Sequence, residues 1–273
     1  MKKIFAILLA MSLLLVACAA LAEDDGLAKV LEKGTLVMGF DEEYPPFGFV
    51  SESGTHVGFD IDLANEVCAR LGVELVLQPV VWESKELELN SGNIDCIWSG
   101  MSITPERQEQ VLFSMPYLNN DQILVVMTDS GIASAEETAG KVLGTQAGSS
   151  SIEALDNNPE FKDALGEVVT DDSFVTMLMD LQLGGIDVLL IDGTVGNYYI
   201  GQQDDPSAFT VLPGILSAEE YGIGFRLGEQ SLADAVNAQL IAIWEDGTLD
   251  AIRANWFAND VTAIAEYADA YRN

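Results

Sequence analysis

Three consecutive segments near the start of the chain decide its fold class. They are residues 35–40 (TLVMGF), residues 59–72 (FDIDLANEVCARLG) and residues 73–78 (VELVLQ). The first and last are short and apolar, which is typical of strands, whereas the middle segment places Ala64, Val67 and Leu71 on one helical face. Gly72 favours the end of that helix. A strand, a helix and a strand in this order predict a parallel sheet covered by helices.

The same alternation continues to the end of the chain. Further strands are expected at 94–98, 122–127, 141–145, 167–170, 186–191 and 221–226, and further helices at 174–183, 231–245, 249–256 and 262–271. Residues 186–191 (IDVLLI) are almost continuously apolar, as expected of a strand buried on both faces. No flexible linker separates the second block, 141–212, from the first, so we expect two α/β lobes joined by two crossings.

Composition excludes several classes of function. The 273 residues include 12 Lys and Arg against 44 Asp and Glu, which gives a net charge of −32. A surface this acidic repels phosphate backbones and anionic headgroups, so nucleic acid is excluded as a partner. Because His56 is the single histidine, a catalytic triad or a multi-histidine metal site would depend on that one residue. We expect no metal or cofactor, and we expect His56 in an exposed hairpin.

The first 22 residues have the pattern of an export signal. Lys2 and Lys3 precede a long apolar run, and residues 20–22 (ALA) form an A-x-A cleavage pattern, which predicts a signal peptide over 1–22. Residues 15–18 (LVAC) resemble a lipobox, in which Cys18 would be lipidated. Both processing routes remain open. The sequence therefore predicts an exported protein, either periplasmic or a lipoprotein on the outer face of the cytoplasmic membrane, which contacts the membrane only through such an anchor.

Two further cysteines lie in the mature chain. Cys68 falls on the apolar face of an expected helix, and Cys96 falls inside an expected strand. An exported protein would allow them to form a disulfide, but two small buried hydrophobic residues is the interpretation that we favour.

Eight collinear segments carry a resemblance to a known family. They are 39–47 (GFDEEYPPF), 58–63 (GFDIDL), 92–107 (GNIDCIWSGMSITPER), 144–150 (GTQAGSS), 186–188 (IDV), 221–223 (YGI), 246–248 (DGT) and 255–257 (NWF). In this order and spacing the chain resembles the amino-acid-binding members of the periplasmic solute-binding proteins, family 3, which feed bacterial ABC importers. The resemblance covers nearly all of the mature chain.

This resemblance implies an α/β fold of the two-lobe periplasmic-binding-protein class, type II. Lobe 1 is expected to comprise 23–117 and 222–273, and lobe 2 is expected to comprise 122–216. The hinge crossings are expected at 117–121 and 217–221. Residues 258–273 extend past the point where similar proteins end, and we expect them to form an added surface helix.

A free amino acid requires a cation for its carboxylate and an anion for its ammonium, each with several hydrogen bonds. In residues 102–107, Thr104 is a good N-cap and Pro105 suits the first helical turn, which places Arg107 at a helix start. A surface charge is the simpler interpretation of Arg107. The resemblance implies instead that Arg107 holds the ligand carboxylate, with Ser102 and the backbone of Gly100.

Asp192 follows the buried strand 186–191, at the strand end where open α/β sheets bind ligands. A helix N-cap and a partner for the ligand ammonium are both compatible with this position, and the resemblance implies the second role. Asp41 follows the strand 35–40 in the same way. The resemblance implies that Tyr44 and Trp82 sandwich the ligand side chain. The complete predicted set is Asp41, Tyr44, Trp82, Ser99, Gly100, Ser102, Arg107, Gln146, Ser150, Ser151 and Asp192.

The turn at 148–151 (GSSS) could bind an anion at a helix N-terminus, but no P-loop lysine follows it, so Gln146 and Ser150 are better interpreted as ligand contacts from lobe 2. The function that we expect is a receptor, not an enzyme, which captures a free amino acid and delivers it to the transmembrane subunits of an ABC permease. The alternative is an enzyme on the same scaffold, such as a cyclohexadienyl dehydratase-like protein, with Glu42 and Glu43 as candidate acids.

Charge gives an expectation about the ligand. A cleft lined by Asp41, Glu42, Glu43 and Asp192, with Arg107 as the one nearby cation, has no partner for a second ligand carboxylate. The sequence therefore predicts that neutral polar or cationic amino acids bind better than acidic ones.

Overall fold

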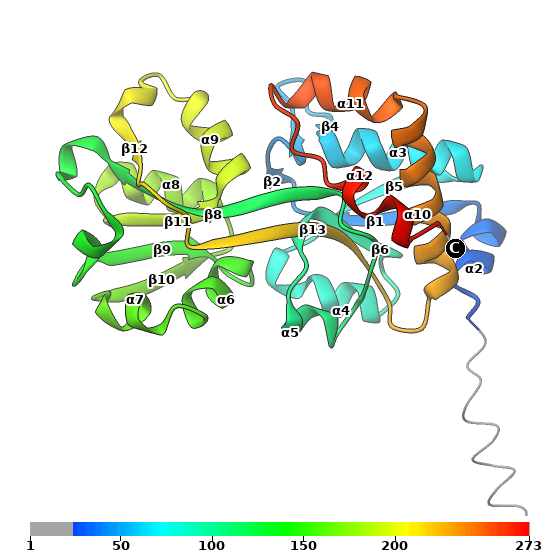
Figure 1. The fold of residues 1–273 in the computed structure, drawn as a ribbon, viewed down its shortest axis with the longest axis horizontal. Coiled ribbons are helices and arrows are strands. Elements are labelled where there is room, and N and C mark those ends of the chain that lie inside the picture. The colour runs from blue at the N-terminus through cyan, green and yellow to red at the C-terminus, as the bar shows by residue number, and fades with distance from the viewer. Residues whose placement is uncertain (1–23, 273) are drawn as a thin grey trace, which may run out of the picture.

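The computed structural model describes residues 24–272 and divides them into two lobes (Figure 1). Lobe 1 contains α2 (Gly26–Lys33), β1 (Thr35–Phe40), β2 (Glu43–Tyr44), β3 (Gly48–Val50), β4 (His56–Val57), α3 (Phe59–Leu71), β5 (Glu74–Pro79), α4 (Lys85–Asn90), β6 (Cys96–Ser102), α5 (Pro105–Gln108), β7 (Leu112–Phe113), α10 (Gln230–Glu245), α11 (Thr248–Trp256) and α12 (Ile264–Tyr267). Lobe 2 contains β9 (Val142–Gln146), α6 (Ser150–Asp156), α7 (Pro159–Ala164), β10 (Glu167–Asp171), α8 (Phe174–Leu183), β11 (Val188–Asp192), α9 (Gly193–Gly201) and β12 (Phe209–Val211).

Two long strands, β8 (Leu118–Met127) and β13 (Ser217–Phe225), run from one lobe to the other (Figure 1). They pair antiparallel with each other from Leu118 opposite Tyr221 to Gln122 opposite Ser217. Beyond this paired region β8 continues into lobe 2 beside β11, and β13 continues into lobe 1 beside β6. The strand order is therefore β10-β9-β11-β8-β13-β6-β1-β5, one sheet that passes through both lobes.

The α/β class predicted from the sequence is confirmed. In lobe 1, β1 pairs in parallel with both β5 and β6, and in lobe 2, β9 pairs in parallel with both β10 and β11. The helix α3 ends at Gly72, which has a φ of 76°, as the sequence indicated. Parallel strands place their carboxyl ends on one edge of the sheet, so β1, β6, β9 and β11 all end toward the junction of the lobes.

Several expected element bounds were wrong. The strand expected at 94–98 is β6, which extends to Ser102, and the strand expected at 221–226 begins at Ser217. Both extensions contain Gly and Ser or acidic residues. The end of β6 pairs with Tyr221 and Gly222 of β13, whereas residues 217–220 pair with β8, so the strand form of both depends on distant partners. The helix expected at 262–271 is shorter, because α12 covers only Ile264–Tyr267 and continues as a 3-10 turn over Ala268–Ala270.

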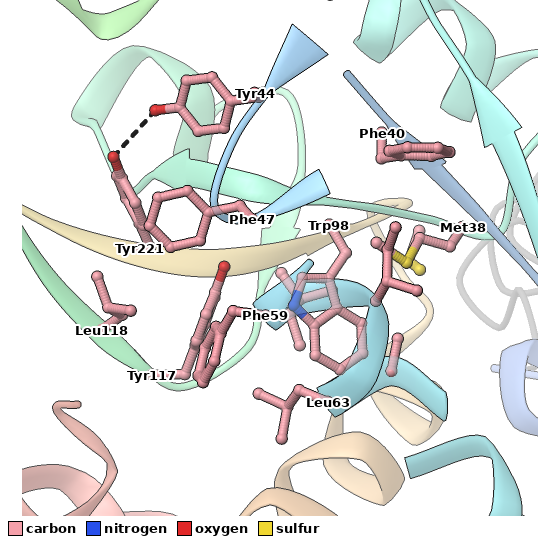
Figure 2. Close-up of a cluster of buried hydrophobic side chains, with 14 of the residues drawn as sticks. Met38, Phe40, Tyr44, Phe47, Phe59, Leu63, Trp98, Tyr117, Leu118 and Tyr221 are labelled. Carbon is pink, nitrogen blue, oxygen red and sulfur yellow. Dashed lines mark hydrogen bonds between the residues drawn. The ribbon is translucent and has the colours of Figure 1, made fainter. Parts of the chain in front are cut away.

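Aromatic side chains fill the part of lobe 1 that adjoins the hinge (Figure 2). The rings of Phe47 and Tyr221 lie 5.4 Å apart in an edge-to-face arrangement, and those of Trp98 and Tyr117 lie 6.2 Å apart. Cys68 and Cys96 are buried beside this core as free thiols, which agrees with the interpretation as small hydrophobic residues. Tyr117 and Tyr221 connect this core directly to the two hinge strands.

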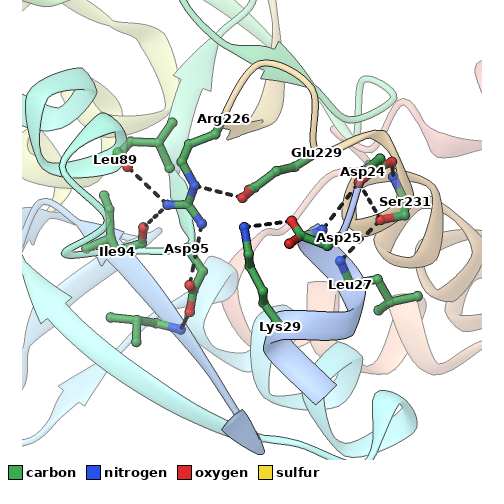
Figure 3. Close-up of polar contacts among 12 residues, drawn as sticks. Asp24, Asp25, Leu27, Lys29, Leu89, Ile94, Asp95, Arg226, Glu229 and Ser231 are labelled. Carbon is green, nitrogen blue, oxygen red and sulfur yellow. Dashed lines mark hydrogen bonds and ion pairs between the residues drawn. The ribbon is translucent and has the colours of Figure 1, made fainter. Parts of the chain in front are cut away.

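A half-buried arginine, Arg226, connects the far end of β13 to the rest of lobe 1 (Figure 3). The Arg226 guanidinium donates to the carbonyl oxygens of Leu89 and Ile94, at 3.0 and 2.5 Å. Its Nε donates to Glu229 at 2.8 Å, and its Nη2 lies 3.6 Å from Asp95. Because the five guanidinium donors are fixed in one plane, these contacts hold the loop before β6 and the start of α10 in one geometry.

The C-terminal segment packs against the hinge. The amide of Asn119 donates to Val261 O at 2.9 Å, and the amide of Ala263 donates to Tyr117 O at 3.0 Å. Ile264 is buried, and Tyr267 donates to the carboxylate of Glu220 on β13. The expected exposed surface helix is therefore wrong in part, because this segment covers the beginning of β8. Among residues 24–272, the helices are too short or too polar to cross a membrane.

Asp60 on α3 is a fully buried carboxyl group that touches both β6 and the start of the hinge. Its Oδ2 accepts from the amide of Gly100 at 2.8 Å and from the hydroxyl of Tyr117 at 3.0 Å. Its Oδ1 has no hydrogen-bond partner among the described residues. Burial raises the pKa of Asp60 to about 7, although both hydrogen bonds oppose the rise. Below pH 7, Asp60 is therefore mainly protonated in the folded protein.

Asp60→Asn is expected to change how stability depends on pH. The pKa of Asp60 is about 7 in the folded protein against 3.8 for the ordinary carboxyl group, so the folded state binds the proton more tightly. The stabilisation is complete below pH 4 and is lost as the pH rises to about 7, which amounts to at most about 4 kcal/mol. Asparagine cannot ionise and keeps an oxygen acceptor. Urea unfolding at pH 5 and pH 8 should therefore show a smaller fall in stability for Asp60→Asn than for the wild type.

Asp234→Asn, on the exposed side of α10, is the matched control and should follow the wild-type pH profile. An Asp60→Asn variant that loses as much stability between pH 5 and pH 8 as the wild type would contradict the assignment of this titration to Asp60.

Candidate ligand-binding site

The carboxyl end of β6 forms the floor of the candidate site. All seven residues of β6 are buried, and Gly100 has a φ of 54°. A Cβ at Gly100 would lie 2.7 Å from the ring of Tyr44 and 2.9 Å from the ring of Tyr221, so a side chain does not fit there. Its amide is held by Asp60, as described above. Ser102, the last residue of β6, is also buried.

Arg107 is held at the start of α5 by the local sequence. The hydroxyl of Thr104 accepts from the Arg107 amide at 3.3 Å, and Pro105 occupies the first turn, as expected from the sequence. The side chain is only 7% exposed, so the interpretation as a surface charge is wrong. The guanidinium donates to Ser102 O and to Gly148 O, each at 3.0 Å, and forms no ion pair with any carboxylate of residues 24–272. A buried cation bound by carbonyl oxygens retains its full charge for an anionic group.

A second buried cation, Lys85, was not predicted from the sequence. Its Nζ lies 4.7 Å from the ring centre of Trp82 and donates to Gly148 O at 3.1 Å. It also lies 3.1 Å from Glu86, which compensates its charge. Burial, followed by the charge of Arg107, lowers the pKa of Lys85 to about 8. The expectation that Arg107 is the one cation near the cleft is therefore wrong.

Lobe 2 contributes the carboxyl end of β9 and the start of α6 to the site. Gln146 donates to Asp41 Oδ2 at 2.7 Å, which joins the two lobes directly. Asp41 is 8% exposed, and burial raises its pKa although hydrogen bonds from Glu43 and Gln146 oppose the rise. The hydroxyl groups of Ser102 and Ser150 lie 3.0 Å apart across the same junction. Ser151 does not line the cavity and donates to Gln122 Oε1 at 2.7 Å.

Asp192, at the end of β11, faces the hinge strands. Its side chain forms no helix-capping hydrogen bond, so the N-cap interpretation is wrong for the side chain. Its Oδ1 accepts from Asn120 at 2.6 Å, from Tyr221 at 2.7 Å and from Gln122 at 2.9 Å. Burial, followed by the charge of Glu219, raises the pKa of Asp192 to about 6.

Four polar residues of the hinge strands were not predicted. Asn120 and Gln122 lie on β8, and Glu219 and Tyr221 lie on β13. Each pair is separated by one residue, so both members of a pair point to the same face of their strand. The sequence does contain this alternation, but these residues were expected only as hinge crossings and not as part of the binding site. The hydroxyl oxygens of Tyr221 and Tyr44 lie 3.0 Å apart (Figure 2).

Most of the predicted residues surround one cavity between the lobes. Its lining comprises Tyr44, Trp82, Gly100, Ser102, Arg107, Gln146, Ser149, Ser150 and Asp192. Ser149 was not predicted, whereas Asp41, Ser99 and Ser151 were predicted and lie behind the lining. The cavity measures about 10 Å³, which is roughly the space needed for a single water molecule. An amino acid can therefore enter only when the lobes separate.

Glu42 and Glu43, the candidate acids of an enzyme, are exposed residues outside this cavity. Glu42 lies 3.0 Å from Nε2 of His56, which is half-buried beside Phe40 and not fully exposed as expected. The assignment of Glu42 and Glu43 as acids in the cleft is wrong, because neither side chain is buried at the cavity, whereas Asp41 is buried and accepts from Gln146 of lobe 2. His56 does lie in the β3–β4 hairpin, as expected.

The architecture and sequence match known proteins over most of the chain. Residues 36–259 match the model of the bacterial extracellular solute-binding proteins, family 3. The L-cystine-binding protein TcyJ of Escherichia coli is 35% identical over 88% of this chain and 89% of its own length. The arginine-binding extracellular protein ArtP of Bacillus subtilis is 32% identical over 84% of this chain and 88% of its own length.

Among solved structures, a substrate-binding protein of an ABC uptake transporter from Streptococcus pneumoniae with bound histidine superposes with a TM-score of 0.85. It is 36% identical, and the match covers 89% of this chain and 99% of that chain. The chain belongs to the bacterial extracellular solute-binding proteins, family 3.

Proposed function

We propose that this protein is an extracytoplasmic receptor that captures a free amino acid between its lobes and delivers it to an ABC permease. One observation carries the proposal: a buried guanidinium, which has no carboxylate partner among residues 24–272, and a buried carboxylate line the same cavity at the junction of the lobes. Arg107 binds the ligand carboxylate, and Asp192 binds the ligand ammonium. The relatives named above, which bind cystine, arginine and histidine, support a ligand of this class.

Binding is coupled to closure of the lobes. Gly148 O accepts from both Arg107 and Lys85, and Asp41 accepts from Gln146, so the contacts across the cavity come from both lobes. A ligand that touches both lobes favours the closed form by its additional contacts in that form. The receptor has no catalytic step in this proposal. An exported location fits the family. Export through a signal in residues 1–22 is part of the proposal, either with cleavage after Ala22 or with lipidation at Cys18, and both positions lie outside the described part of the chain.

Replacing Arg107 by Lys should weaken amino-acid binding by more than about tenfold, which corresponds to about 1.4 kcal/mol. Lysine keeps the charge but loses the planar pair of donors. Thermal-shift screening of the amino acids, cystine and ornithine identifies the ligand, since binding raises stability. Calorimetry then compares Arg107→Lys with the control Arg272→Lys, whose exposed side chain pairs with Glu245 and Asp269. Equal affinity of Arg107→Lys and the wild type would remove Arg107 from the site.

Neutral polar or cationic amino acids should bind better than aspartate or glutamate. Asp192 lines the cavity, and Asp41 and Glu219 accept from the lining residues Gln146 and Ser150, whereas Lys85 is compensated by Glu86. Once the ligand carboxylate is bound to Arg107, a second ligand carboxylate has no free cation, and its burial costs several kcal/mol. Competition binding at fixed pH and salt measures this order. A tighter inhibition constant for glutamate than for glutamine, lysine and arginine would show that the charge argument fails.

A further inference from the structure

Glu219 places a second carboxylate beside Asp192. Its Oε2 accepts from Ser102 Oγ at 2.7 Å and from Ser150 Oγ at 3.0 Å. The same oxygen accepts from Gln122 Nε2 at 3.1 Å and from Asn120 Nδ2 at 3.3 Å. Glu219 lies directly opposite Asn120 in the register of the two hinge strands, so its position is set by the backbone pairing.

The two carboxylates share their donors. Asn120 and Gln122 donate to Asp192 as well as to Glu219, and Gln122 Nε2 also lies 3.2 Å from Ser150 Oγ. An amide nitrogen has two hydrogens, so Gln122 cannot satisfy all three of these oxygens at once. Asp192 and Glu219 therefore compete for the hydrogens of Gln122 at the point where the two acidic side chains meet.

The pair also lacks a compensating cation. Within residues 24–272, no lysine, arginine or histidine nitrogen lies within 4.0 Å of either carboxylate. The groups that face Asp192 are Asn120 and Gln122 from β8, Glu219 and Tyr221 from β13, Tyr44 from β2, and more remotely Arg107 from α5. Burial raises the pKa of Tyr44 and Tyr221 well above the ordinary value, so both remain neutral.

Two neighbouring carboxylates without a cation favour retention of one proton. The raised pKa of Asp192 agrees with this geometry. An ammonium group would supply the missing positive charge, and it brings three donor hydrogens of its own.

We propose that Glu219 and Asp192 together form the ammonium site, and that the proton held by this pair is released when the ammonium of the amino acid binds. The proton leaves the carboxyl pair for solvent, and the ligand ammonium takes its place. Glu219 is thus a specificity-determining residue, which makes the site require a positively charged nitrogen. This inference rests on the proposed amino-acid receptor function and adds a residue and a linked proton to it.

Proton release determines the direction in which the affinity for the amino acid changes with pH. Without ligand, Asp192 holds a proton below its raised pKa of about 6, whereas a bound ammonium favours the charged carboxylate. Binding therefore releases a proton near pH 6, and affinity falls as the pH decreases. Between pH 7.5 and pH 5 the affinity should fall about tenfold. A group that must be deprotonated for binding lowers the affinity by up to about tenfold for each pH unit below its pKa.

The test is calorimetry at pH 6 in two buffers that differ in ionisation enthalpy, together with dissociation constants from pH 5 to pH 8. The probe is whichever of L-arginine, L-lysine and L-glutamine gives the largest thermal shift, since none of their side chains titrates in this range. The wild type should release a fraction of one proton. Glu219→Gln should release less and should show a flatter pH profile, whereas Glu219→Asp keeps the charge and should retain the pH dependence.

Glu220→Gln is the matched control. Glu220 is the next residue on β13, points to the opposite face and accepts from Tyr267, so its loss should leave proton release unchanged. Binding without proton release by the wild type, or equal proton release by Glu219→Gln and the wild type, would overturn this inference and leave the receptor function standing. A wild type that binds none of the amino acids would instead reject the receptor function itself.

Discussion

The antiparallel pairing of β8 with β13 is the constraint on which the rest of the structure depends. This ladder, from Leu118 opposite Tyr221 to Gln122 opposite Ser217, joins the two lobe sheets into one. Its register also decides which side chains lie beneath the cavity. A shift by one residue would turn Asn120 and Glu219 away from the site, because side chains alternate between the faces of a strand. The same pairing therefore supports the fold and part of the candidate site.

Polar contacts hold the two lobes together around the cavity, and such contacts suit lobes that must separate for a ligand to enter. Gln146 bonds to Asp41, and Gly148 O accepts from two cations of lobe 1. Such contacts can exchange with water when the lobes separate, at a smaller cost than exposing an apolar interface. The largest apolar cluster has members in both lobes, and the rings of Tyr44 and Phe174 lie 6.2 Å apart across the junction. The aromatic residues around Tyr117 anchor the hinge on the side of lobe 1 (Figure 2). The C-terminal segment strengthens that anchor through its contacts with residues 117–119.

The sequence predicted those parts of the fold and site that depend on local patterns. The βαβ order, the N-cap at Thr104 and the acidic residue after the strand 186–191 can each be found within a short window. Lys85 could not be found in this way. It follows a polar stretch and has the pattern of an exposed residue, and its burial depends on Gly148 from the other lobe. Glu219 and Gln122 likewise depend on the register of two strands that are far apart in the sequence.

A crystal structure of the protein with the amino acid identified by thermal shift tests the central claim most directly. The account predicts that the guanidinium of Arg107 binds the ligand carboxylate, and that the ligand ammonium lies within hydrogen-bond distance of Asp192 and Glu219. It also predicts a cavity larger than the present 10 Å³, with both lobes in contact with the ligand. A ligand bound outside the junction of the lobes, or one whose carboxylate faces Asp192, would contradict the account.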